Sequence, residues 1–351
     1  MCEPGEQVLS DVHVDVLRSS KLSNEGKATT RFYFRVPLKS SDRVGRSSLS
    51  ASASTTTKDA ENATLTAKLE DHIHSLKFEQ PSSVEDEATL DEDGDLVVVR
   101  KDRRQDVVVI EHAMATTIKD VGLQVWQGCL LLCDFILNNP EIFRGEVALE
   151  LGAGVGLGSI VVATMASTVF CTDIGLDVLK LCQRNVINNC KLFMNEDPQV
   201  DHDVRVRELD WFQSTNTTMT NSSSAFQWGK KDEVLLHEVT IIIAADVIYD
   251  DELTDAFFKT LHHLMTTGKE KIAFIALEKR LNFTVDDLKV TCKAYDHFLK
   301  HITTLVSSPA VKVKYIAEKL PVDFMECSQY TRTEQMELWQ IRAVRSGLDP
   351  E

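Results

Sequence analysis

The stretch from Glu146 to Gly158, EVALELGAGVGLG, constrains the fold of this chain more than any other. A short apolar run ends on a glycine-dense turn, and the helix-like segment SIVVATMAS follows at once. This pattern predicts a strand, a tight loop and a helix. Glycines at Gly152, Gly154 and Gly156 remove the Cβ atoms that would keep a ligand away from the backbone, so the loop is typical of a nucleotide-binding α/β domain.

The spacing of this loop narrows the class of ligand. The dinucleotide pattern G-x-G-x-x-G fails in both registers, because its last position holds Leu157 or Ser159, and no Gly-Lys-Ser/Thr follows as in a P-loop. The loop instead reads E-L-G-x-G-x-G, with Glu150 at the end of the strand. A carboxylate beside the ligand suits a cationic amino-acid or sulfonium group better than a pyrophosphate. A glycine-rich turn that binds nothing stays open as the alternative.

Strand and helix patterns alternate along the rest of the chain, which predicts an α/β fold with a doubly wound parallel sheet. An amphipathic helix ending at Asn138 leads into the glycine-loop strand, and a Thr284-x-x-Asp287 capping box predicts the start of the last helix. Two late apolar runs without a helix between them predict a C-terminal antiparallel hairpin. The expected strands are 147–151, 169–174, 204–209, 239–247, 271–279, 311–320 and 336–344, and the helices between them are 156–167, 176–189, 251–267 and 285–304.

The N-terminal region differs in composition from the rest. Residues 1–95 are rich in Ser, Thr and acidic residues, so we expect them to be largely disordered, with a strand-like island from Arg31 to Leu38. The folded domain is expected over residues 96–345. It would open with an antiparallel pair formed by LVVVR (96–100) and DVVVIEHA (106–113).

Composition limits the function. Acidic residues number 54 against 38 basic ones, a net charge of −16, which disfavours direct nucleic-acid binding and is compatible with a basic protein substrate. Eight cysteines without a C-x-x-C pair, no signal sequence and no membrane-length apolar run predict an intracellular protein of the nucleus or cytoplasm. No metal site is expected, because the pairs Cys129/Cys133 and His262/His263 each lack a second pair of ligands.

The glycine loop, the acid after the second strand and the terminal hairpin together resemble the seven-stranded class I methyltransferases, which use S-adenosylmethionine. Within them, ADVIY (245–249), VWQGCLLLCDFIL (125–137) and LDW (209–211) are similar to motifs of the methyltransferase-like protein lysine methyltransferases, family 16. The resemblance covers about residues 96–345 and implies a seven-stranded, mostly parallel Rossmann-like sheet. It also implies a nucleic-acid-binding protein as substrate, nuclear residence and molecular chaperones as partners.

This resemblance gives several residues a role at the cofactor. Asp173, seventeen residues beyond Gly156, would accept hydrogen bonds from the ribose hydroxyls. Asp210 or Trp211 would lie at the adenine, although core packing explains a tryptophan equally well, and the same holds for Trp126 at the cofactor entrance. The expected cofactor residues are Trp126, Glu150, Gly152, Gly154, Gly156, Asp173, Asp210, Trp211 and Ala245.

Asp246 and Tyr249 are the candidate catalytic residues. A lysine amine has an ordinary pKa of about 10.4, and its protonated form has no lone pair to attack a methyl group. A carboxylate and a phenol three residues apart can orient the nitrogen through hydrogen bonds and a cation–π contact, with the proton lost to water. Glu278 and Arg280 would border the peptide channel. The alternatives are a helix cap for Asp246 and a surface ion pair for the other two.

Two other functions remain open at this point. Methylation of RNA or a small molecule is disfavoured by the acidic charge and because positions 246–249 read DVIY rather than Asn/Asp-Pro-Pro-Tyr. A scaffold that binds the cofactor without transferring a methyl group is disfavoured by the intact glycine loop, Asp173 and Asp246.

Overall fold

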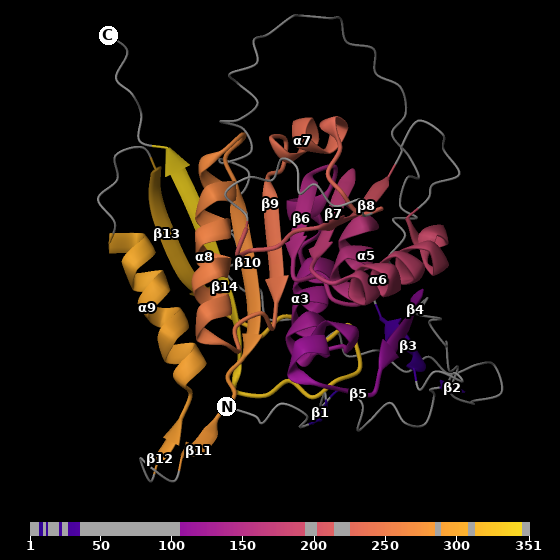
Figure 1. Cartoon of the computed structure of the whole chain (residues 1–351), viewed down its shortest axis with the longest axis horizontal. Coiled ribbons are helices and arrows are strands. Elements are labelled where there is room, and N and C mark those ends of the chain that lie inside the picture. The colour runs from indigo at the N-terminus through magenta and orange to yellow at the C-terminus, as the bar shows by residue number, and fades with distance from the viewer. Residues whose placement is uncertain are drawn as a thin grey trace, which may run out of the picture. The chain divides into compact units, whose positions relative to one another are not determined.

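The centre of the computed structural model is a seven-stranded sheet of order β13-β14-β10-β9-β6-β7-β8 (Figure 1). The structure describes residues 7–9, 12, 21–22, 27–35, 106–193, 202–213, 225–284, 289–307 and 313–345, which all belong to one unit made of 1–39 and 105–351. The strands are β6 (Val147–Leu151), β7 (Thr168–Asp173), β8 (Asp203–Glu208), β9 (Ile241–Ala245), β10 (Ile272–Glu278), β13 (Val313–Leu320) and β14 (Met336–Arg345).

Six of these strands point the same way: β8, β7, β6, β9 and β10 pair in parallel, and β13 joins them across β14, which runs antiparallel to both β10 and β13. The C-terminal hairpin therefore does more than close an edge, because its second strand, β14, lies between β13 and the parallel strands. The predicted doubly wound, mostly parallel sheet with a C-terminal antiparallel hairpin is confirmed.

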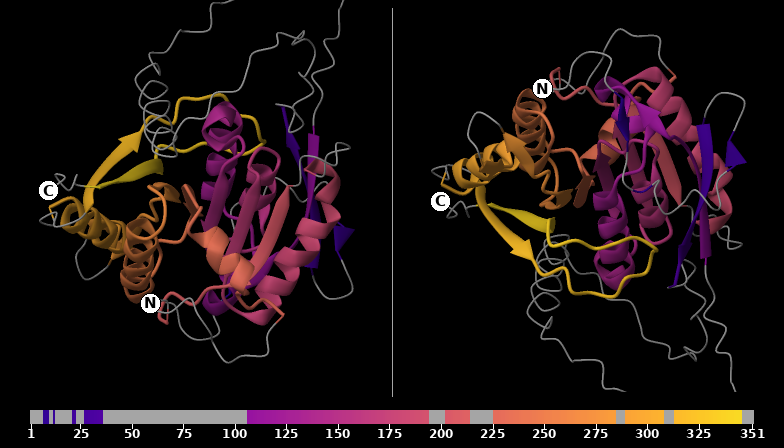
Figure 2. Two further views of the ribbon diagram at one scale, coloured as in Figure 1. Left: turned by 90° about the horizontal axis from the view of Figure 1, so that it is seen from above. Right: turned by 90° about the horizontal axis from the view of Figure 1, so that it is seen from below.

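Helices cover both faces of the sheet. The alternating side chains of a strand point to opposite faces, and Phe274 of β10 packs on Phe135 of α3, 4.8 Å between ring centroids, whereas Ile275 joins the cluster that contains Phe257 and Phe298. Helices α8 and α9, in orange, lie together and apart from the magenta α3 in both views of Figure 2. The helices are α3 (Gln127–Asn138), α4 (Pro140–Phe143), α5 (Leu157–Ala163), α6 (Leu176–Asn188), α7 (Lys230–Leu236), α8 (Asp251–Thr266) and α9 (Lys293–Ser307), with 3₁₀ turns η1 (Ile118–Leu123) and η2 (Cys190–Leu192).

A second, smaller sheet begins in the region expected to be largely disordered. There β3 (Lys27–Phe34) pairs along its full length with β4 (Asp106–Ala113), and β2 (Lys21–Leu22) adds to its other edge. Asn185 of α6 and Asn189, the residue that caps its end, hold β4 by its backbone: Asn185 Oδ1 accepts from Glu111 N, and Asn189 Oδ1 from Val109 N, both at 2.9 Å. The expected partner of β4, 96–100, lies outside the described residues. A short pair, β1 (Val8–Leu9) with β5 (Ala115–Thr116), completes this region.

The predicted start of the last helix is wrong. A capping box was expected at Thr284, but β11 (Asn282–Thr284) and β12 (Lys289–Thr291) form an antiparallel pair, and α9 begins only at Lys293. The β-favouring residues Phe283 and Val290 are direct partners in this pair. The backbone pairing of these two strands outweighs the local capping signal, which by itself contributes only about 1 kcal/mol.

Within the described residues, one stretch, Ile118–Asn138, is long and apolar enough to cross a membrane by length and composition. It is interrupted, because extended residues separate η1 from α3, and α3 alone has 12 residues against the roughly 20 that a bilayer requires. Moreover, 67% of its apolar window is buried in the protein. These properties are typical of a core helix.

Candidate active site

A cleft opens where the carboxyl ends of the parallel strands meet. The strand order reverses between β6 and β9, the position at which open α/β sheets bind their ligands. The cleft is lined by Lys119, Val121, Gly122, Gln124, Val125, Trp126, Cys129, Glu150, Gly152, Ala153, Gly154, Val155, Asp173, Ile174, Val178, Leu209, Asp210, Trp211, Phe212, Ala245, Asp246, Val247, Tyr249 and Leu253. All nine expected cofactor residues except Gly156, and both candidate catalytic residues, are among them.

The glycine loop depends on having no side chain at Gly154. This residue has a φ of +53°, and a Cβ atom here would lie 2.9 Å from the carbonyl oxygen of Gly122. Its N–H donates to Asp173 Oδ2 at 2.7 Å. The loop is therefore pressed between η1 and the end of β7, and any larger residue would have to displace one of them.

Asp173 is held at the end of β7 by backbone donors. Besides the bond from Gly154, its Oδ1 accepts from Ile174 N at 2.7 Å. Burial raises the pKa of Asp173, and these two bonds act against that rise. Each carboxylate oxygen can accept more than one hydrogen bond, so capacity remains for ribose hydroxyls. That contact stays a prediction.

Glu150 lies deeper than the sequence pattern suggests. Its side chain is buried and accepts a short hydrogen bond from Ser159 Oγ. Burial raises the pKa of Glu150 to about 8, and the nearby charge of Asp173 adds to this effect. The carboxyl is consequently mostly protonated at neutral pH in the empty cleft, and a cation in the cleft would favour its ionised form.

The segment after β8 supplies an acid and two aromatic rings. Asp210 accepts from Phe212 N and from Gln213 Nε2, both at 2.9 Å, which fixes the turn. Trp211 is buried with its ring edge-on to Phe257 at 5.3 Å, yet it also lines the cleft, so the core and cofactor interpretations both fit its position. Phe212 is exposed and lines the cleft as well. Sequence reasoning missed Phe212, although its position beside a tryptophan was a signal.

Asp246 links three elements. Its Oδ2 accepts from Gly128 N in the first turn of α3 at 2.6 Å, and its Oδ1 accepts from Glu278 N at the end of β10 at 2.9 Å. It has a φ of +52°, the one positive value at a non-glycine residue in the described part of the chain. Strained backbone of this kind concentrates at functional sites. The helix-cap alternative fails, because Asp250 caps α8 by accepting from Leu253 N.

Tyr249 stands at the mouth of the cleft. The residue is 42% exposed and lies at the cleft's edge. Partial desolvation raises the pKa of Tyr249 to about 12, and the charges of Asp173 and Asp250 add to the rise. The phenol therefore keeps its proton at neutral pH and can donate as well as accept a hydrogen bond.

The two expected channel residues lie beside the cleft rather than in its lining. The Glu278 carboxylate accepts a hydrogen bond from Thr333 Oγ1 at 3.2 Å, and the Glu278 backbone N–H donates to Asp246 Oδ1. The Arg280 guanidinium lies 4.9 Å from the ring centroid of Trp126, whose Nε1 donates to Val121 O. The structure thus connects Arg280 to the cleft through Trp126, and its role toward a peptide stays a prediction.

Comparison with known proteins identifies the family. The model of the lysine methyltransferase family matches residues 104–225 and 214–304. This chain belongs to the lysine methyltransferase family. Methyltransferase-like protein 22 from Homo sapiens is 42% identical over 294 residues, 73% of this chain and 71% of that protein. The Mus musculus protein of the same name is 43% identical over 237 residues, 67% of this chain and 59% of that protein.

A more distant relative is named as an enzyme that methylates lysine in proteins. Protein-lysine methyltransferase METTL21E from Mus musculus is 29% identical over 145 residues, 41% of this chain and 51% of that protein. Together with the family match, these relatives make the chain an S-adenosylmethionine-dependent protein-lysine N-methyltransferase.

The lining of the cleft fits this cofactor. Four acidic residues line it near the ends of four strands: Glu150, Asp173, Asp210 and Asp246. Among the described lining residues, Lys119 is the single basic one. An acidic cleft suits a ligand that carries an ammonium and a sulfonium group, and it opposes a pyrophosphate. The bare backbone at Gly152 and Gly154 would accommodate the amino-acid end. Bound there, S-adenosylmethionine supplies an electrophilic methyl group.

Proposed function

We propose that this lysine methyltransferase acts on a lysine within a basic segment of a nucleic-acid-binding protein, in the nucleus or cytoplasm. The observation that carries the proposal is an acidic rim: Tyr249 at the cleft mouth is followed by three exposed acids, Asp250, Asp251 and Glu252. Protein segments that bind nucleic acid are rich in Lys and Arg, because they neutralise phosphates. An acidic rim attracts such a segment and repels nucleic acid itself.

The net charge of −16 acts in the same direction over longer distances. The similarity to methyltransferase-like protein 22 supports a protein substrate, and family resemblance adds molecular chaperones as candidate partners.

Under this proposal the residues of the rim prepare the nucleophile. The carboxylates draw in the lysine ammonium, which must then lose a proton, because its ordinary pKa is about 10.4. Tyr249 orients the nitrogen through its hydroxyl group and the face of its ring. Asp246 acts by position, since both of its oxygens hold backbone N–H groups of α3 and β10. The proton leaves to water, and proximity supplies most of the rate enhancement.

The proposal is tested by labelling separate nuclear and cytosolic extracts with tritiated S-adenosylmethionine and the full chain, followed by mass spectrometry of labelled proteins. We expect methyl-lysine in a lysine-rich stretch of a nucleic-acid-binding protein. Glu252→Lys should lower the labelling rate of that protein about 3-fold, because rim charges govern association. The matched control is Glu238→Lys, which makes the same charge change just before the amino end of β9, the end of the strand opposite the cleft.

Label that resists protease but disappears with ribonuclease would contradict a protein substrate. Label on a protein without a basic segment, unaffected by Glu252→Lys, would contradict the role of the rim while leaving the methyltransferase activity intact.

A further inference from the structure

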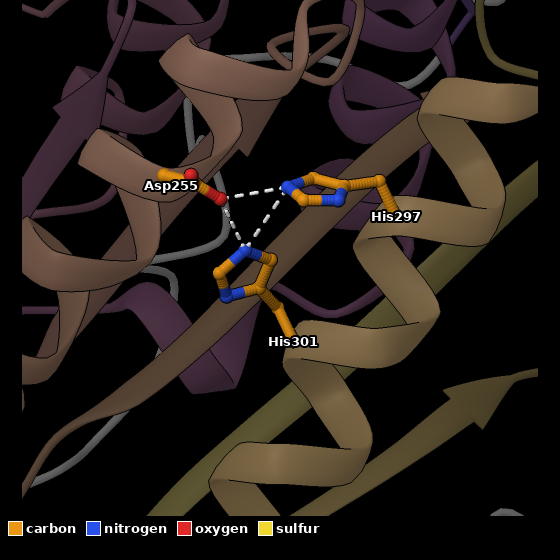
Figure 3. A group of neighbouring side chains, drawn as sticks. All are labelled: Asp255, His297 and His301. Carbon is orange, nitrogen blue, oxygen red and sulfur yellow. Dashed lines mark hydrogen bonds and ion pairs between the residues drawn. The ribbon is translucent and has the colours of Figure 1, made fainter.

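A cluster of metal-ligating side chains lies between α8 and α9, outside the cleft. His297 and His301 are four residues apart on α9 and therefore share one face of that helix, and Asp255 faces them from α8 (Figure 3). Both Nε2 atoms lie 2.7 Å from Asp255 Oδ1, and they lie 3.3 Å from each other. The three ligand atoms thus converge on one point.

These distances are close to those of a tetrahedral metal site. With Zn–N bonds of about 2.0–2.1 Å, two nitrogens of a tetrahedral zinc ion are about 3.3 Å apart, which matches the separation of the imidazoles. The carboxylate oxygen is closer to the nitrogens than such an ion allows, so Asp255 would have to withdraw by roughly half an ångström. Its side chain is 61% exposed and has room to do so.

The two imidazoles are more firmly placed than the carboxylate. Their side chains are only 25% and 26% exposed. His301 stacks on Phe258 with ring centroids 4.7 Å apart and an angle of 8° between the planes, and Phe258 is itself buried in the core. Two histidines at this helical spacing form a recurrent zinc-binding pair. The half-exposed third ligand leaves the fourth position open to water.

A cluster held by hydrogen bonds alone is the alternative to a metal site. Without a metal, both rings would donate an Nε2–H to the same oxygen, which brings two N–H groups against each other across 3.3 Å. One cation in their place would accept both nitrogen lone pairs and the carboxylate oxygen, with each ring carrying its proton on Nδ1.

We propose that Asp255, His297 and His301 bind one divalent transition-metal ion, zinc in the first place, with water as the fourth ligand. Imidazole with carboxylate is a donor set that suits zinc. The ion would fasten α8, whose first turn follows Tyr249, to α9. The site neither touches the cleft nor depends on the identity of the methylated protein. The sequence contained half of its signal, the His-x-x-x-His spacing, but not its aspartate.

The test uses the full chain without an affinity tag, stripped with a chelator and titrated with Zn²⁺ alone. We expect one equivalent of zinc to bind, with a rise in melting temperature. The double variant H297Q/H301Q should weaken this binding at least about 100-fold and abolish the thermal shift. His263→Gln is the matched control, because His263 lies on α8 outside the cluster and its loss should change neither result.

A second variant separates a metal site from a hydrogen-bonded cluster. Asp255→Asn keeps an oxygen that accepts imidazole N–H groups but removes the charge that binds a cation, so zinc affinity should fall about 10-fold or more. The zinc-free melting temperature should change little, because the Asp255 side chain is 61% exposed. Co²⁺ bound by the wild type should lack a thiolate charge-transfer band, which excludes the cysteines. Absence of zinc binding by the wild type, or equal affinity in Asp255→Asn, would overturn the proposal.

Discussion

Asp173 and Asp246 make the same kind of contact with different consequences. Each lies at the carboxyl end of a parallel strand, and each accepts two backbone N–H bonds. The donors to Asp173 are Gly154, 19 residues away in sequence, and its own next residue, Ile174. The donors to Asp246 come from α3 and β10, 118 and 32 residues away in sequence. The cofactor side therefore joins segments that are close in sequence, whereas the transfer side joins three elements that are farther apart.

The largest effect should come from a substitution in the glycine loop, on the cofactor side. Gly154→Arg should abolish cofactor binding, because its φ of +53° disfavours a side chain and its Cβ would lie 2.9 Å from Gly122 O. Isothermal titration with S-adenosylmethionine should show at least a 100-fold loss, from roughly 3 kcal/mol or more of strain and clash. Gly145→Arg is the matched control, since Gly145 also has positive φ but no atom within 4 Å of its Cβ.

Equal losses in the two variants would mean that backbone strain alone decides binding, and that contact between the loop and η1 is irrelevant.

Asp246→Ala should separate transfer from binding. It leaves the N–H groups of Gly128 and Glu278 without their acceptor, at a cost of about 1–3 kcal/mol each in stability. We expect methyl transfer to fall at least about 100-fold while cofactor affinity changes less than about 3-fold. Asp173→Ala should show the reverse, with a 10- to 100-fold loss of affinity. Asp246→Asn, which tolerates positive φ and retains one acceptor, should recover part of the activity.

These variants are compared by single-turnover transfer and by cofactor titration in the same preparation. Transfer by Asp246→Ala at the wild-type rate would contradict a role for Asp246 in the reaction. Equal losses of transfer and of cofactor affinity would contradict the proposed difference between Asp246 and Asp173.

The same contrast between local and distant contacts explains how much the sequence could predict. Strand β6 has the bounds expected from its apolar run, and the glycine loop and Asp173 lie in the cleft, because these features depend on neighbouring residues. The bonds of Asp246 to Gly128 and Glu278 have no local signature. Only the folded sheet brings their elements together.

The features that the sequence did not predict have the same origin. The described partner of β4 is β3, about eighty residues upstream, whereas the expected partner, 96–100, lies outside the described residues. At Thr284 the sequence has a capping pattern, but the β11–β12 strand pair forms there in place of a helix start. Likewise, the His297/His301 spacing is visible in the sequence, whereas Asp255 joins it only through the packing of α8 against α9.

Glu150 offers a pH test of the cofactor side. Its folded-state pKa of about 8 lies above the ordinary value of 4.5, so the folded state holds a proton that the unfolded state releases. Stability from this group therefore falls as pH rises from about 4.5 to 8. Glu150→Gln can still accept a hydrogen bond from Ser159. At pH 8 it should raise the free energy of unfolding of the cofactor-free protein by roughly 1–3 kcal/mol, and with it the melting temperature. Near pH 4.5 it should leave both unchanged.

The difference between variant and wild type is followed by thermal unfolding across this pH range. A difference that is constant with pH would show that Glu150 does not titrate in this window.

The smallest effect should come from Arg280, whose guanidinium lies on the ring of Trp126 between the cofactor side and the transfer side. A partly exposed cation–π contact is worth about 0.5–1 kcal/mol, so Arg280→Ala should raise the KM for the protein substrate about 2- to 5-fold. Cofactor affinity should not change, because Arg280 does not line the cleft. Arg144→Ala, an exposed arginine before the amino end of β6, is the control. If cofactor affinity fell instead, Trp126 would transmit the loss, and Arg280 would belong with Asp173 on the cofactor side.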